Sequence, residues 1–160
     1  MLENTVLAFI GSGTMAEAMI KGILNKGLTE PDHIIASGPR PERGRELEKR
    51  YGVKGTTDNK EAAQAADIVV LSIKPQVLPV VLDELRGLIR PHQLVFSIVA
   101  GARIETIARG LQHRAIVRVM PNTPAQIGEG MSVWELSYRA QKVGRQYFRS
   151  LETFIIAAAF

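Results

Sequence analysis

The glycine-rich segment Gly11-Ser12-Gly13-Thr14-Met15-Ala16 is the first group of residues whose spacing suggests chemistry. It has the form G-x-G-x-x-A. In this form the first glycine permits a tight turn, the second lets the backbone approach a diphosphate, and the alanine keeps a helix close to a strand. The N–H groups at the start of such a helix face the phosphates. The segment therefore predicts a dinucleotide site, with a purely structural turn as the alternative.

The residues that follow the second apolar run bear on which nucleotide is preferred. An NAD-binding fold usually carries an acidic residue there, about 20 residues after the glycine segment, to hold the ribose 2′-hydroxyl. Here Ala36, Ser37 and Gly38 occupy that place, and Arg40 and Arg43 follow them. A hydroxyl and guanidinium groups suit a 2′-phosphate through charge-assisted hydrogen bonds. We therefore predict that NADP(H) is preferred, with NAD(H) possible; the alternative is that both arginines are solvated.

Three further segments follow expected strands, at the carboxyl ends where open α/β sheets bind ligands. They are Ser72-Ile73-Lys74-Pro75, Val99-Ala100-Gly101 and Met120-Pro121-Asn122-Thr123-Pro124. Small residues at such an end let a nicotinamide ring approach the backbone, and Lys74 could meet an anion of the cofactor or substrate. Lys74 could equally be an exposed loop lysine. The prolines around Asn122 and Thr123 could pin this polar pair at a site or simply make a rigid turn.

Several other chemistries find no support in the residues. The chain has no cysteine, which excludes a disulfide framework, thiol catalysis and a thiolate-bound metal. His33, His92 and His113 lack metal-ligand spacing, so no metal is expected. Motifs for a serine nucleophile or a Walker loop are also missing. Hydride transfer needs none of these, because the nicotinamide carries the chemistry and the protein orients it.

Alternating strands and helices position these segments. Apolar, β-branched runs predict strands over Thr5–Ile10, Asp32–Ser37, Asp67–Ile73, Gln93–Val99 and Ala115–Met120. Helical spacing predicts helices over Thr14–Asn25, Pro41–Tyr51, Asn59–Ala65, Pro75–Leu88 and Ile104–Leu111. One more strand is expected within Ala125–Leu136, followed by a helix over Tyr138–Phe154. This alternation predicts an α/β fold, a Rossmann-type doubly wound, mostly parallel sheet with helices on both faces.

Composition and net charge limit the kinds of binding partner that we expect. The chain has 160 residues, 46% of them hydrophobic, and a net charge of +4. The basic residues between Arg139 and Arg149 could attract nucleic acid, but a solvated helix face is the stronger interpretation because no aromatic side chains are interleaved. No apolar run approaches the roughly 20 residues of a membrane span. We therefore expect neither a nucleic acid nor a membrane partner, and a cytoplasmic location, which suits the lack of cysteine.

Five segments in a fixed order carry a family resemblance. They are FIGSGTMAEAMIKGIL, IIASGPRPER, TDNKEAAQAADIVVLSIKPQ, SIVAGARIETI and VRVMPNTPAQIGEGMS. With them, roughly Val6 to Met131 resembles pyrroline-5-carboxylate reductase. The resemblance implies NADPH-dependent reduction of 1-pyrroline-5-carboxylate, a small-molecule imine, to L-proline. Hydride would pass from the nicotinamide to the C=N carbon in this step of proline biosynthesis.

The resemblance also implies a role for each matching residue. Around the diphosphate it places Ile10, Gly11, Gly13, Thr14 and Met15. On the adenosine side it places Ser37, Gly38, Arg40 and Asn59. Around the nicotinamide half it places Ile73, Lys74, Pro75, Ala100 and Gly101. Asn122 and Thr123 would face the pocket between nicotinamide and substrate, and no catalytic residue is assigned beyond these two candidates.

The resemblance ends before the chain does. Members of the family are considerably longer, and their helical second half dimerises and supplies the substrate-carboxylate pocket; its glycine-serine-glycine-proline-alanine stretch is missing here. We therefore expect residues 1–136 to form the dinucleotide-binding domain and residues 137–160 to form a helix and apolar tail that begin a missing or truncated helical domain. A homo-oligomer formed through this C-terminal region is expected. The alternative function is a short NADP-binding module without reductase activity, acting as a sensor or docking protein.

Overall fold

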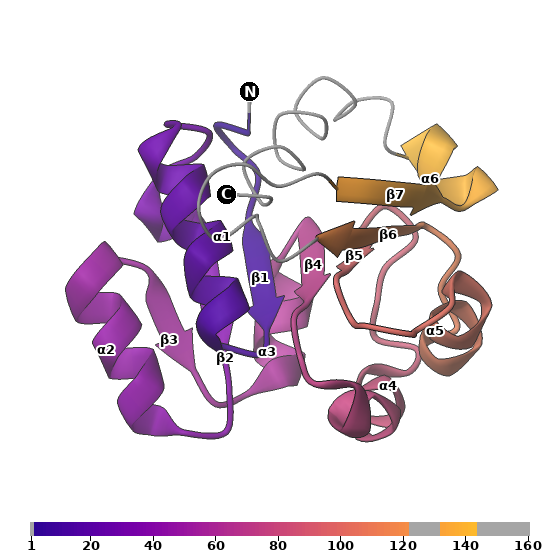
Figure 1. The fold of residues 1–160 in the computed structure, drawn as a ribbon, viewed down its shortest axis with the longest axis horizontal. Coiled ribbons are helices and arrows are strands. Elements are labelled where there is room, and N and C mark those ends of the chain that lie inside the picture. Colours follow the sequence, from indigo (N-terminus) through magenta and orange to yellow (C-terminus); the bar gives the residue numbers. More distant parts are fainter. Residues whose placement is uncertain (1, 122–131, 144–160) are drawn as a thin grey trace.

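One mixed sheet forms the centre of the molecule. The computed structural model describes residues 2–121 and 132–143. Within them the strands are β1 (Leu7–Ile10), β2 (Ile34–Ser37), β3 (Lys54–Thr56), β4 (Ile68–Leu71), β5 (Leu94–Ser97), β6 (Ile116–Pro121) and β7 (Ser132–Leu136). Their order is β3-β2-β1-β4-β5-β6-β7 (Figure 1). The first six are parallel and β7 pairs antiparallel with β6. The predicted α/β fold is confirmed.

The strand order changes direction beside β1. The first three strands run outward from β1 in the order β1, β2, β3, and the chain then crosses back to β4 on the other side. Such a reversal leaves a crevice at the carboxyl ends of β1 and β4, where doubly wound folds bind their ligands. The glycine segment follows β1 directly, so the topology brings it to this crevice.

Helices cover both faces of the sheet. They are α1 (Thr14–Asn25), α2 (Pro41–Tyr51), α3 (Asn59–Ala65), α4 (Leu78–Leu85), α5 (Ile104–Leu111) and α6 (Tyr138–Val143), with 3₁₀-helices at Pro31–His33 and Pro75–Val77. Leu7 and Phe9 of β1 are fully buried in a core shared with α1 and α2. The alternate residues Ala8 and Ile10 are fully buried in a second core shared with α3, α4 and α5. This period of two explains why the central strands are apolar throughout.

Most helix bounds agree with the sequence prediction, and the differences have local causes. Helices α1, α2, α3 and α5 begin and end as predicted. The helix expected over Pro75–Leu88 is instead a 3₁₀ turn followed by α4, which ends at Leu85 shortly before Gly87 with its φ of +73°. Strand β3 was not predicted, because its three residues are too few and too polar to give a strand pattern. The predicted helix beyond Val143 lies outside the described residues.

Candidate functional site

The glycine segment makes a tight loop against the end of β4. Gly11 has a φ of +104°, and a Cβ atom added there would lie 2.6 Å from the carbonyl oxygen of Ser72. The Ser72 hydroxyl donates to the carbonyl of Gly11 at 2.7 Å, and its N–H donates to the carbonyl of Ile10 at 2.9 Å. Only glycine meets both the backbone angle and the close approach at this position. Ser72, for which no role of its own was predicted, therefore holds the loop against the end of β4.

Gly13 leaves open space at the start of α1. It is the N-cap residue of α1 with no side-chain cap, and a Cβ atom added there would meet no described atom within 4 Å. The first N–H groups of a helix have no partner within the helix, and they give this end a partial positive charge. Open space beside the loop, in front of the N–H groups of a helix N-terminus, fits the diphosphate of a dinucleotide.

The loops after β1 and β2 pack closely together. The N–H of Gly11 donates to the carbonyl of Ser37 at 2.9 Å. Ser12 is buried, and a Cβ atom added to Gly38 would lie 2.2 Å from its hydroxyl oxygen. Gly38 is therefore needed for contact between the two loops. The structure thus brings together the glycine segment and the residues predicted for the adenosine side.

Ser37 and Asn59, both predicted for the adenosine side, contact each other. The hydroxyl of Ser37 donates to Oδ1 of Asn59 at 2.6 Å. The amide of Asn59 in turn donates to Glu84 at 3.0 Å. Ser37 is fully buried, so its hydroxyl serves Asn59 and is not exposed to the crevice. The remaining groups predicted to recognise a 2′-phosphate are the guanidinium groups of Arg40 and Arg43.

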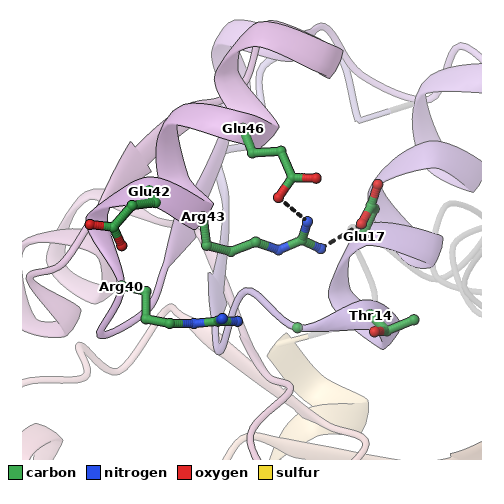
Figure 2. Close-up of a pocket in the computed structure, with 7 residues that line it drawn as sticks. Thr14, Glu17, Arg40, Glu42, Arg43 and Glu46 are labelled. Atoms are coloured by element: carbon green, nitrogen blue, oxygen red, sulfur yellow. Dashed lines mark hydrogen bonds and ion pairs between the residues drawn. The ribbon is translucent and has the colours of Figure 1, made fainter.

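A pocket of about 390 Å³ opens between α1 and α2 beside the glycine loop. It is lined by Gly13, Thr14, Glu17, Arg40, Glu42, Arg43 and Glu46. Figure 2 shows the side chains of Arg40 and Arg43 running side by side toward the start of α1. Arg40 is exposed and forms no ion pair with any residue that the structure describes. Arg40 is thus placed to receive an anionic group that enters the pocket.

Arg43 has a different environment from Arg40. Its side chain is 14% exposed and is held between the carboxylates of Glu17 and Glu46, at 2.8 Å from the latter. Glu17 also accepts hydrogen bonds from Arg50 and Tyr51. The hydrogen bond from Arg43 is the largest of several effects that lower the pKa of Glu17 to about 2. Both partners therefore stay charged at neutral pH, and the positive charge of Arg43 is already compensated.

The residues predicted for the nicotinamide half follow β4 and β5, which are adjacent strands. Ile73 is half-buried against the glycine loop, since its Cγ2 would lie 2.8 Å from a Cβ atom added to Gly11. Lys74, Pro75, Ala100 and Gly101 are exposed. The carboxyl ends of parallel neighbours share one edge, so these residues lie along the same edge of the sheet as the glycine loop. Asn122 and Thr123 lie outside the described residues.

The described part of the chain holds no group of histidine, aspartate and glutamate side chains suited to a metal ion. Among the histidines, His113 is buried, with Nε2 at 2.9 Å from the carbonyl oxygen of Gln93. Burial lowers the pKa of His113. His113 therefore acts as a structural side chain that connects the segment before β6 to the segment before β5. In the same described ranges, no helix has the length and apolar character to cross a membrane.

A doubly wound sheet with a glycine loop after β1 is typical of dinucleotide-binding proteins. Comparison with known proteins identifies the family. The chain belongs to the family described as "NADP oxidoreductase coenzyme F420-dependent", whose model matches residues 6–101. Within this class it is similar to pyrroline-5-carboxylate reductases. It is 42% identical to the one from Synechocystis sp. over 127 residues, and 41% identical to pyrroline-5-carboxylate reductase 2 of Bacillus subtilis over 138 residues. The resemblance predicted from the sequence segments is confirmed.

Solved structures agree with this assignment. The pyrroline-5-carboxylate reductase of Coxiella burnetii matches 98% of the chain with a TM-score of 0.87 at 28% identity. The Plasmodium falciparum enzyme, solved with NADP bound, matches 98% of the chain with a TM-score of 0.80 at 26% identity. The chain covers 57% and 56% of these two structures, and 47% and 49% of the two relatives named above. It therefore spans about half the length of the proteins that it matches.

Proposed function

We propose that this chain binds NADP(H) at the crevice beside β1 and forms the cofactor-binding half of a pyrroline-5-carboxylate reductase. The observation that carries the proposal is the open space at Gly13, next to a pocket lined by Arg40. The diphosphate would lie against the glycine loop and the first turn of α1. The adenosine end would lie toward α2, and the nicotinamide end toward the residues after β4 and β5.

Arg40 accounts for a preference for NADP(H) over NAD(H). A 2′-phosphate would meet a guanidinium group that no described carboxylate neutralises, whereas Arg43 is neutralised by two. A charge-assisted bond of this kind is roughly twice as strong as a neutral one. The adenosine ribose of NAD(H) offers no such anion at this position, so Arg40 would contribute little to its binding.

In the proposed reaction the nicotinamide, when bound, would supply a hydride to the C=N carbon of a small cyclic imine. The residues of this chain bind and orient the cofactor. Ile73, Lys74, Pro75, Ala100 and Gly101 would border the nicotinamide half, and Asn122 and Thr123 are the candidates that face the substrate. Since the chain spans about half of its relatives, we propose that turnover requires the segment they have beyond it.

Titration with NADPH and NADH tests this proposal. Arg40→Glu should weaken NADPH binding at least tenfold and leave NADH within about threefold, since only NADPH carries the 2′-phosphate. Arg45→Glu is the matched control, because Arg45 is an exposed arginine of α2 that does not line the pocket. An equal loss of both nucleotides on changing Arg40 would refute the 2′-phosphate assignment. Failure of the unaltered chain to bind either nucleotide would refute the function.

A second assay separates the reductase half from an independent binding module. The chain is mixed with 1-pyrroline-5-carboxylate and NADPH, and loss of NADPH absorbance is followed alone and after fusion to the second half of a related reductase. Turnover restored by the fusion supports the proposed reductase. Tight NADPH binding without turnover in the fusion would favour the module that only binds NADP(H).

A further inference from the structure

Arg43 reaches the glycine loop as well as the two carboxylates. Its Nε–H donates to the carbonyl oxygen of Ser12 at 2.8 Å, while its two terminal nitrogens bind Glu17 and Glu46. The two ion pairs are drawn in Figure 2. The side chain thereby bridges α2, α1 and the loop that joins β1 to α1. All three of its nitrogens have a protein acceptor, which fixes the plane of the guanidinium group.

The bond to Ser12 determines the direction of a neighbouring donor. The carbonyl of Ser12 and the N–H of Gly13 belong to one peptide group, and they point in opposite directions because a trans peptide is planar. No described peptide bond is cis. By holding the carbonyl toward α2, Arg43 turns the N–H of Gly13 to the opposite side of the loop. A Cβ atom added to Gly13 would meet no described atom within 4 Å.

Arg43 is poorly suited to bind a phosphate itself. Glu17 and Glu46 already compensate its charge, and the hydrogen bond to Glu17 raises the pKa of Arg43 further. A phosphate that approached Arg43 itself would meet these two carboxylates and would be repelled by them. Arg40, on the same wall of the pocket, has no described carboxylate partner. The two arginines of this pocket therefore differ in whether a described carboxylate already compensates their charge.

We propose that Arg43 is a positioning residue for the cofactor diphosphate. It fixes the Ser12–Gly13 peptide before a nucleotide arrives, and it takes no part in recognising the 2′-phosphate. The inference rests on the proposed binding of NADP(H) at this loop. It predicts that a change at Arg43 affects every ligand that carries the diphosphate, with or without the 2′-phosphate.

The test compares Arg43→Lys with Arg50→Lys. Lysine keeps the positive charge beside Glu17 but lacks the planar set of donors that holds Ser12. Arg50 is the matched control, because it binds the same two carboxylates and makes no bond to the loop. Arg43→Lys should weaken NADPH and NADH by the same factor, about tenfold. Arg50→Lys should change either by no more than about twofold.

A measurement without nucleotide reports on the loop directly. In ¹H–¹⁵N spectra of the ligand-free chain, the amide signal of Gly13 should move in Arg43→Lys and stay in place in Arg50→Lys. This signal can be measured without a cofactor. If the unaltered chain failed to bind nucleotide, the proposed function would be refuted, and the signal would still show whether Arg43 positions the loop.

Three results would overturn the inference. Selective loss of NADPH in Arg43→Lys would mean that Arg43 contacts the 2′-phosphate. Equal losses in the Arg43 and Arg50 variants would mean that the ion-pair network acts only by holding the helices together. Unchanged affinities with an unmoved Gly13 signal would mean that Arg43 has no effect on the loop.

Discussion

Replacing Gly13 with valine separates the fold of the glycine loop from its proposed binding function. Gly13 has a φ of −80° and a ψ of −168°, which any residue can adopt. A Cβ atom added there meets no described atom within 4 Å. We therefore expect the free energy of unfolding to change by less than about 1 kcal/mol, as for substitutions that create no clash or cavity.

The same substitution should remove nucleotide binding. The valine side chain would fill the space proposed for the diphosphate and keep its oxygens from the loop. Loss of two hydrogen bonds to a charged group, at about 1.5–3 kcal/mol each, corresponds to roughly 3–6 kcal/mol. This is about two to four orders of magnitude in Kd.

Two assays measure the two effects on one sample. Urea denaturation followed by far-ultraviolet circular dichroism gives the free energy of unfolding, and fluorescence titration gives the NADPH affinity. An unchanged Kd would show that the diphosphate does not lie against Gly13. A loss of several kcal/mol in stability would show that the space beside Gly13 is needed for folding, and would contradict the expected small change in the free energy of unfolding.

Two further predictions concern the same loop and its supports. Gly11→Ala should destabilise the fold by at least about 2 kcal/mol, because alanine is strained at a φ of +104° and its Cβ would lie 2.6 Å from Ser72; a urea midpoint equal to that of the unaltered chain would contradict this. Glu17→Gln tests the lowered pKa. With a pKa of 4.5 unfolded and about 2 folded, Glu17 stabilises the fold above pH 4.5, by roughly 3 kcal/mol at most, and this is lost as the pH falls toward 2. The stability difference between the variant and the unaltered chain should shrink over that pH range, and a constant difference would refute the assignment.

Local signals explain which elements were predictable. Helix α2 begins at Pro41 and ends before Gly52, whose φ is +75°, and both residues are recognisable in the sequence. The apolar runs of the central strands identify them in the same way, because both of their faces are buried. The strand β3 has no such run, and only its pairing with β2 makes it a strand.

The same distinction between local signals and distant contacts applies to the candidate site. The glycine segment, Arg40 and the residues after β4 and β5 were predicted, since each follows an apolar strand. The roles of Ser72 and Arg43 were missed, because their partners in the loop lie 61 and 31 residues away in the chain. Cofactor contacts of individual residues, the boundary between residues 136 and 137, and a homo-oligomer through the C-terminal region stay predictions.

The alternation of strands and helices, the glycine loop and the family could be predicted from the sequence alone, because they depend on residues close together in the chain. Which of the two arginines is available to an anion depends instead on the packing of the helices. Arg40 and Arg43 are three residues apart and equally charged, so the sequence cannot rank them. The fold places Glu17 of α1 beside Arg43 and leaves Arg40 exposed. The difference between them is electrostatic, and it exists only once α1 and α2 are packed side by side.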